Sequence, residues 1–256
     1  MGKVVSRIGL AMGSFVVAVV LWQGVVWLGD YPVFILPPPA AVAGRFVSLV
    51  ADGSLWHHTS VTLREVLAGL GLGALVAILL GYGLAHSSLA ERVLAPFIVA
   101  SQSIPVVAIA PLLVIWFGTE VLSKIVVCAL TVFFPILVNT VVGVRSVERD
   151  LHDLMRAMEA SRWQTIWLLE VPAALPVLLG GLKVGATLAV IGAVVGEFVA
   201  SSEGLGYLLK QGQQLYDTPL VFVGIGTLMV LAMSLYGAVA LAERVLLRWR
   251  AEGRKE

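Results

Sequence analysis

The chain has 256 residues, of which 59% are hydrophobic and only 13% are charged, and its mean hydropathy is +0.97. Globular domains carry about 25% charged residues, so a water-soluble core cannot hide this much apolar surface. The net charge is only +1, so the placement of the charges is more informative than their sum. A single cysteine, Cys128, excludes an internal disulfide and a cysteine-based metal site.

Six runs of the sequence are apolar enough to cross a bilayer as helices, which takes about 20 residues each. They lie at about residues 8–28, 66–85, 93–117, 124–144, 178–199 and 220–241. The first run follows a short basic start but contains Trp22 and Trp27 and has no small-residue cleavage site, so it is not a secretory signal. We therefore predict an all-α membrane protein with six transmembrane helices in a single domain, residues 1–256.

The basic residues predict the orientation of these spans, because cytoplasmic loops are enriched in Lys and Arg. With both termini in the cytoplasm, twelve basic residues lie inside and four outside, the four being Arg45, Arg64, Lys124 and Lys210. Lys183, near the inner end of the fifth run, fits the same orientation. The segment between the fourth and fifth runs is then cytoplasmic.

Two external segments have distinct patterns. After a proline run, Val42, Phe46, Leu49 and Val50 are spaced as one face of a helix, which predicts either an amphipathic helix on the outer membrane surface or a plain connecting helix. Residues 201–219, SSEGLGYLLKQGQQLYDTP, are polar and punctuated by glycine. This second segment is a candidate contact for an extracytoplasmic partner.

The cytoplasmic segment VERDLHDLMRAMEASRWQTIWLLEVP, residues 147–172, has mixed polarity. Its first half places Leu151, Leu154, Met155 and Met158 on one face of a helix. In its second half, Ser161 can cap another short helix, and Pro172 and Pro176 are expected to stop the pattern before the fifth span. The pattern indicates an element that a partner protein grips, and it leaves open an amphipathic loop resting on lipid headgroups.

This segment resembles the cytoplasmic EAA loop of bacterial ABC importer permeases, whose pattern is Glu-Ala-Ala, three residues, Gly, nine residues, and Ile-x-Leu-Pro. The frame here is Asp153-Leu154-Met155, then Glu159 at the glycine place, then Leu169-Glu170-Val171-Pro172. The spacing is kept in full and the identities in part. Five stretches are similar to the subfamily that imports sulfonates, nitrate, taurine and vitamin precursors: residues 101–118, 133–147, 160–164, 171–176 and 180–209.

The resemblance implies a type I ABC importer permease in the bacterial cytoplasmic (inner) membrane, with no catalytic, cofactor, metal or nucleic-acid site of its own. It further implies a second permease copy, two ABC ATPases that hold ATP and Mg, and a periplasmic or lipoprotein substrate-binding protein, all in membrane lipid. The ATPase-coupling loop would span about residues 145–176. Its implied contact residues are Asp153, Leu154, Met155, Glu159, Ala160, Ser161, Arg162, Trp163 and Pro172.

Glu159 departs from the family pattern. Glycine there would permit a bend with a positive φ, whereas glutamate favours a continued helix. Arg156 or Arg162, three residues away on either side, can offset its charge. We predict a bend at Glu159, because Ser161 is a suitable start for a second helix. One continuous helix is the alternative.

Small and polar residues within the spans indicate packing and a pathway. The pairs Gly69/Gly73, Gly181/Gly185 and Gly192/Gly196 have GxxxG spacing, which predicts close helix packing within one subunit or, less simply, across a dimer. Polar groups at membrane depth usually face a cavity or another helix. The candidates for lining a translocation pathway are Gln102, Ser103, Asn139 and Glu197.

A strongly anionic cargo would favour several basic residues along its path through the membrane. The predicted spans offer only Lys183 for such a path. This pattern favours a neutral or weakly charged ring compound. Residues 185–209 are most similar to permeases for aromatic heterocycles, and this resemblance implies the thiamine pyrimidine precursor or riboflavin, with an alkanesulfonate, taurine or nitrate as the alternative. The sequence has no GxxxxGK[ST] phosphate loop, so ATP hydrolysis is expected on a separate subunit. An intramembrane enzyme would need acid or histidine clusters at a membrane face, which the pattern does not provide.

Overall fold

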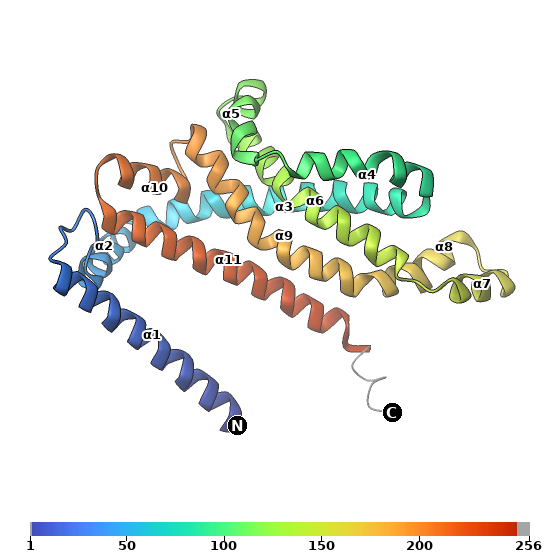
Figure 1. Ribbon diagram of the computed structural model, residues 1–256, viewed down its shortest axis with the longest axis horizontal. Helices are drawn as coiled ribbons and strands as arrows, with labels where there is room; N and C mark the ends of the chain where they lie inside the picture. Colours follow the sequence, from blue (N-terminus) through green and yellow to red (C-terminus); the bar gives the residue numbers. More distant parts are fainter. Residues whose placement is uncertain (1, 250–256) are drawn as a thin grey trace.

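The computed structural model describes residues 2–249, except for the side chains of residues 2–12, 15, 88, 91 and 99. This part of the chain is built of helices and connecting turns (Figure 1). The helices are α1 (Gly2–Gly29), α2 (Pro39–Ala51), α3 (Ser54–His86), α4 (Ser88–Gln102), α5 (Val106–Phe117), α6 (Val121–Arg145), α7 (Arg149–Ala157), α8 (Arg162–Thr165), the π-helical turn η1 (Ile166–Glu170), α9 (Val171–Ala200), α10 (Leu205–Gln214) and α11 (Thr218–Leu246).

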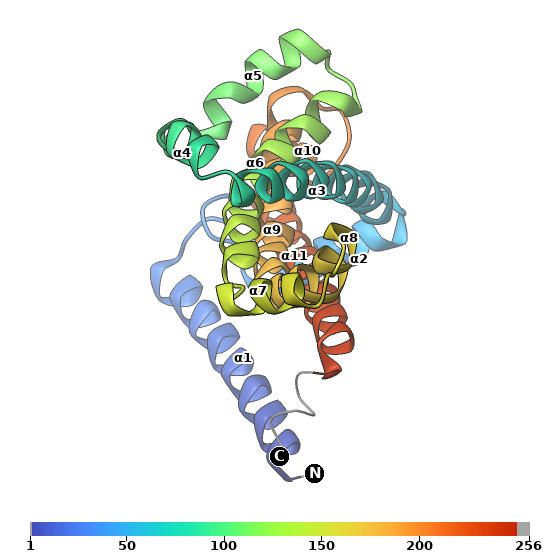
Figure 2. The ribbon, with the colours of Figure 1, turned by 90° about the vertical axis from the view of Figure 1, so that its right-hand side faces the viewer.

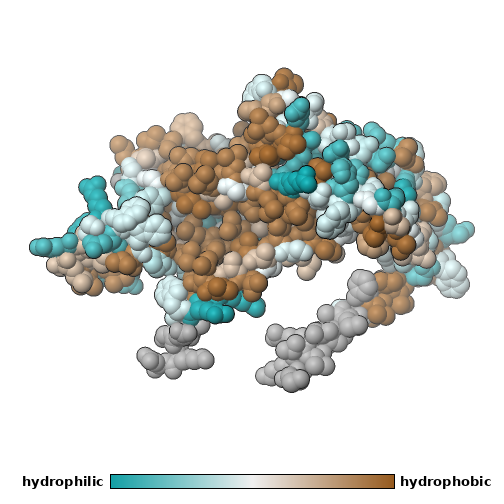
Figure 3. Space-filling model, turned by 180° about the vertical axis from the view of Figure 1, so that it is seen from behind, coloured by the Kyte–Doolittle hydropathy of each residue, from teal (hydrophilic) through white to brown (hydrophobic). Residues whose placement is uncertain are grey.

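Four helical segments are long and apolar enough to cross a membrane: Ser54–His86, Val121–Arg145, Arg162–Ala200 and Thr218–Leu246. They contain the second, fourth, fifth and sixth predicted spans. The first predicted span lies in α1, which is 28 residues long. Figure 3 shows the matching surface, a broad apolar belt with polar residues gathered toward both ends of the molecule. A lipid bilayer covers such a belt.

The third predicted span is not one straight helix. The helices Arg92–Gln102 and Val106–Phe117 meet at an angle of 94°. Pro105 lacks the N–H that would continue the helix, and the residue before a proline is disfavoured in the α conformation. Pro105 accordingly has extended backbone angles, with φ −63° and ψ 122°, and α5 begins directly after it. The sequence Ser-Ile-Pro therefore divides this span into α4 and α5.

The core is a three-helix layer in which α6 lies between α3 and α9 (Figure 1). Glycines make this close approach possible. A Cβ atom on Gly73 of α3 would lie 2.6 Å from the Ala129 carbonyl oxygen of α6, and one on Gly192 of α9 would lie 2.8 Å from Cys128 Cα. The predicted packing of the glycine pairs within one subunit is thus confirmed for these two contacts.

The remaining helices lie around this layer. α1 stands apart from the bundle along most of its length in both Figure 1 and Figure 2. Near its end, Trp22 stacks on Phe222 of α11 with ring centroids 5.2 Å apart. α2 and α10 cover one end of the bundle, and α7 and α8 project from the other (Figure 1). The helix predicted after the proline run is confirmed as α2, with Leu49 buried.

Candidate functional site

The predicted coupling loop is a helical hairpin, in which α7 is followed by a sharp turn and then α8. Glu159 has a φ of +53°, the left-handed conformation. The amide of Ala160 donates to the Met155 carbonyl and the amide of Glu159 donates to the Arg156 carbonyl, each at 3.0 Å. These two bonds form a Schellman motif, in which the residue at the position of Glu159 is usually glycine. The predicted bend is confirmed, and the continuous helix is wrong.

The second helix of the hairpin begins as predicted at Ser161. Its hydroxyl accepts from the Gln164 amide at 3.3 Å, and the Gln164 side-chain oxygen accepts from the Ser161 amide at 2.8 Å, a capping box. The predicted stop at Pro172 and Pro176 is wrong, because α8, η1 and α9 form one 39-residue helical run from Arg162 to Ala200. Pro172 lies in the first turn of α9, and Pro176 lies inside this helix. The preceding π turn shifts the hydrogen-bond register, and the Val171 amide donates to the Ile166 carbonyl, so the missing N–H of Pro172 does not break the run.

The hairpin carries exposed apolar side chains. Trp163 is 67% exposed, and its ring lies 5.5 Å from that of Trp167 in a T-shaped arrangement. Leu154 and Met158 are also exposed on α7 and its C-terminal turn. The Arg156 guanidinium pairs with Asp153 at 3.1 Å. Among the other predicted contact residues, Met155, Ala160 and Pro172 are half-buried, and Glu159, Ser161 and Arg162 are exposed. The hairpin thus presents exposed apolar side chains at the end of the bundle from which α7 and α8 project (Figure 1).

A buried carboxylate anchors the hairpin to the bundle, and the sequence analysis did not select it. Glu170 is 4% exposed. Its Oε2 accepts from the Tyr82 hydroxyl at 2.7 Å, and its Oε1 lies 3.2 Å from Nε2 of both His86 and His152. Tyr82 and His86 belong to α3 and His152 to α7, so three elements meet at Glu170. The signal in the sequence was an acidic residue inside the apolar run IWLLEVP.

The structure places the predicted pathway residues in different surroundings. Gln102 lines a cavity of about 430 Å³ beside the bend between α4 and α5, together with Thr131 and Phe134 of α6. Ser103 is the C-terminal cap of α4 and is exposed. The Asn139 side-chain nitrogen donates to the Pro135 carbonyl at 2.8 Å, and Asn139 packs against Gly181. The pathway role of these residues stays a prediction.

Glu197 lies in a buried polar cluster at the end of the bundle that carries α10. It is 0% exposed, and its Oε1 accepts from the Thr62 hydroxyl at 2.6 Å. The backbone amide of Gly206, in α10, donates to its other carboxylate oxygen. Next to it, Lys124 pairs with Glu65 at 3.7 Å, and both side chains are buried. The cluster ties α10 to α3 and α9, and Lys124 is a buried ion-pair partner rather than an exposed flanking charge.

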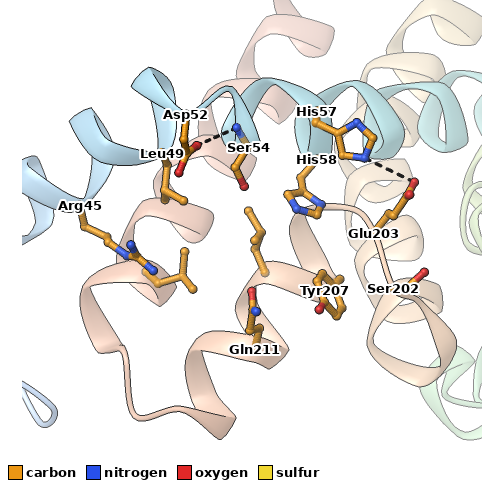
Figure 4. A pocket seen from close by; sticks show the side chains of 12 residues that line it. Arg45, Leu49, Asp52, Ser54, His57, His58, Ser202, Glu203, Tyr207 and Gln211 are labelled. Atoms are coloured by element: carbon orange, nitrogen blue, oxygen red, sulfur yellow. Dashed lines mark hydrogen bonds and ion pairs between the residues drawn. The ribbon is translucent and has the colours of Figure 1, made fainter.

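A polar pocket of about 450 Å³ opens beside this cluster (Figure 4). It lies between α2, α3 and α10. The Arg45 guanidinium at its edge pairs with Asp217 at 2.8 Å. His57 pairs with Glu203 at 3.6 Å, and His58 Nδ1 accepts from the Gly204 amide at 3.0 Å. The charged and histidine side chains Arg45, His57, His58 and Glu203 of this pocket therefore already have partners within the chain.

An apolar belt, a glycine-packed helical core and an exposed hairpin at one end define a multi-pass membrane protein. Residues 69–248 match the family described as binding-protein-dependent transport system inner membrane component, and the chain belongs to this family. It is 49% identical over 238 residues to the riboflavin transport system permease protein RibX of Chloroflexus aurantiacus, covering 93% of this chain and 89% of that one. It is 37% identical over 236 residues to the formylaminopyrimidine transport permease protein ThiX of Halalkalibacterium halodurans, covering 92% and 94%.

A third relative is the putative aliphatic sulfonates transport permease protein SsuC of Bacillus subtilis, 34% identical over 242 residues, with 94% of this chain and 87% of that one covered. Among solved structures, the fold is similar to an inward-facing conformation of the MetNI methionine ABC transporter. The TM-score is 0.62 at 20% identity, covering 75% of this chain and 94% of that one. The fold is that of type I ABC importer permeases.

Membership in this family assigns the general activity. The chain is the inner-membrane permease subunit of an ATP-driven ABC importer, and it passes a small solute delivered by an external binding protein. A separate ATPase subunit hydrolyses the ATP. The intramembrane enzyme considered from the sequence is thereby set aside.

Proposed function

We propose that the solute is riboflavin or a related neutral heterocycle such as a thiamine pyrimidine precursor. The 49% identity to RibX over 93% of this chain supports this substrate class. The charges within the spans support it too. The two lysines of the four long spanning helices are each paired with a carboxylate, Lys124 with Glu65 at 3.7 Å and Lys183 with Glu243 at 2.7 Å. Neither ammonium is left to neutralise an anionic sulfonate or nitrate.

Reconstitution tests this proposal. The permease, its ATPase and its binding protein are placed in proteoliposomes, and ATP-dependent uptake of labelled riboflavin is measured against competing formylaminopyrimidine and taurine. We expect riboflavin uptake that the heterocycle reduces and taurine does not. Uptake of taurine or an alkanesulfonate with none of riboflavin would instead support the alternative indicated by the similarity to SsuC.

We also propose the topology and assembly. The six spans are α1, α3, the bent pair α4–α5, α6, α9 and α11, forming one domain with both termini in the cytoplasm. α1 supports the sixth span because its 28 residues rise about 42 Å, more than the hydrocarbon thickness of about 30 Å. Two permease copies would pair with two ATPases that carry ATP and Mg. A periplasmic or lipoprotein binding protein would meet the end formed by α2 and α10.

The proposed docking element for each ATPase is the hairpin of the coupling loop, about residues 145–176. Its exposed apolar side chains support this role, since a surface that projects from the membrane belt has no lipid to cover it. A cysteine replacing Ala160 should crosslink to the ATPase in the assembled complex. A folded complex that contains the ATPase but gives no crosslink from this position would count against docking here.

A further inference from the structure

The hydrogen bonds around Glu170 need more protons than neutral histidines carry. His86 Nδ1 lies 3.0 Å from the Tyr82 carbonyl while its Nε2 lies 3.2 Å from Glu170 Oε1. His152 repeats the arrangement, with Nδ1 3.4 Å from the Glu148 carbonyl and Nε2 3.2 Å from the same Oε1. Carbonyl and carboxylate oxygens only accept. A neutral imidazole has one N–H, so it can satisfy only one of its two contacts.

Protonation of Glu170 does not resolve this shortage. A proton on Oε1 could be donated to one ring only, and the other ring would still need both of its nitrogens to donate. Oε2 is already the acceptor of the Tyr82 hydroxyl. At least one of the two histidines must therefore be an imidazolium when all four ring contacts are made.

The surrounding charges limit the number of protons held. Arg156 of α7 and Arg162 of α8 line the same cavity of about 710 Å³ as both histidines and Glu170. Arg145, at the end of α6, donates to the carbonyls of Leu84 and Ala85 beside His86. The positive guanidinium groups repel a second imidazolium. The two rings share the single negative charge of Glu170, which offsets only one added proton. One extra proton shared by the two rings fits this balance.

A metal ion does not account for the arrangement. Among the residues that the structure describes, no group of three or more His, Cys, Asp or Glu side chains is placed to hold one. Both Nε2 atoms converge on a single oxygen at hydrogen-bond distance. The cluster of Glu170, His86 and His152 is here named the histidine clamp.

We propose that Glu170 is a positioning residue of the coupling hairpin, and that the proton held by the histidine clamp sets how firmly α7 is tied to α3 and α9. With the proton present, Glu170 holds α7 through His152 and α3 through His86 and Tyr82. Without it, at least one ring contact is lost and α7 gains freedom to move. The consequence for transport rests on the proposed function, because a docked ATPase is what makes the position of α7 matter.

The direct test measures the motion of α7 in the full chain. A spin label on Met158→Cys, at the exposed end of α7, reports the ratio of mobile to immobilised spectral components between about pH 5.5 and pH 8, the range in which histidine titrates. Buried Cys128 does not compete for the label. We expect the ratio to rise about tenfold with pH, the factor that corresponds to about 1.4 kcal/mol, near the lower limit for a hydrogen bond to a charged group.

Two substitutions of His152 make the test specific. His152→Gln removes the imidazole that contacts Glu170, so the label should be mobile at every pH. His152→Arg keeps a permanent charge, and the cavity beside it offers room, so the label should be immobilised at every pH. Glu170→Gln should also abolish the pH response, whereas Glu120→Gln, at an exposed position elsewhere, should keep it. A pH-independent ratio in the unsubstituted chain, or a wild-type profile in His152→Gln, would overturn the proposal.

The assembled importer separates this inference from the docking proposal. With riboflavin as the probe, His152→Gln should raise the ATP consumed per riboflavin imported about tenfold, and Glu120→Gln should leave it unchanged. If the mobility of the label depends on pH but His152→Gln leaves the ATP consumed per riboflavin unchanged, Glu170 is not a positioning residue for coupling. If the Ala160 crosslink to the ATPase fails while the label still titrates, the docking proposal is refuted and the proton-dependent clamp stands.

Discussion

The left-handed backbone of Glu159 allows its role to be tested by one substitution. A residue with a Cβ atom in this conformation costs about 1–2 kcal/mol relative to the right-handed region, and glycine does not bear this cost. Glycine also has more conformational freedom in the unfolded chain, and ordering it on folding costs about 0.5–1 kcal/mol of stability. The midpoints of the two ranges leave a net gain of about 0.75 kcal/mol for Glu159→Gly, which corresponds to about a 3.5-fold shift toward the bent hairpin.

The assay is the ligand-stimulated ATPase activity of the importer assembled with its ATPase and binding protein. We expect Glu159→Gly to raise this activity, because the hairpin that docks the ATPase is more often in its bent form. Glu159→Ala is the matched control, since it removes the charge but keeps the Cβ atom and the strain. If alanine raises the activity as much as glycine, the charge and not the backbone is responsible.

Two results would refute the reasoning on Glu159. Lower activity in the glycine variant would mean that helix continuity matters at this position, with glycine costing about 1 kcal/mol as it does in a helix interior. Unchanged activity would mean that neither the bend nor helix continuity limits coupling. Amide hydrogen exchange at Ala160, whose N–H closes the Schellman motif, measures the stability of the turn independently of the ATPase.

Three further substitutions test the hairpin surface, the buried cluster and the helix core. Trp163→Asp should uncouple transport from ATP hydrolysis and weaken ATPase co-purification without changing thermal unfolding, because only an exposed side chain is altered; a large loss of thermal stability would contradict this. Glu197→Gln should lower the free energy of unfolding in detergent by about 1–3 kcal/mol, because one of its two buried donors loses its carboxylate acceptor, whereas exposed Glu203→Gln should change it little. Gly73→Ala should destabilise the chain because its Cβ would lie 2.6 Å from a backbone carbonyl of α6, whereas Gly71→Ala, with nothing within 4 Å, should not; equal effects would refute the proposed α3–α6 packing.

The sequence by itself determined the features that depend on local pattern. Apolar runs of about 20 residues indicate membrane-spanning helices. Lipid offers no hydrogen-bond partners, so only a helix or a closed barrel, in which the backbone groups pair with one another, can cross it. The capping box at Ser161 was foreseeable because both of its bonds join residues three apart. The break at Pro105 was also visible locally as Ser-Ile-Pro, although apolarity alone suggested an uninterrupted span.

Only the tertiary structure decided which polar side chains meet. His86 and Glu170 are 84 residues apart, and Thr62 and Glu197 are 135 apart, so no local spacing predicts either hydrogen bond. Each pair forms because glycine contacts set the position of α3 and α9 against α6, and that register brings particular residues of the helix ends together. Glu197 was a candidate pathway residue by its sequence, and that role stays a prediction; the packing adds that its carboxylate is buried and accepts a hydrogen bond from α10. Glu170 was named from the sequence only as part of the EAA-loop pattern, and its anchoring role was missed because its partners come from two other helices.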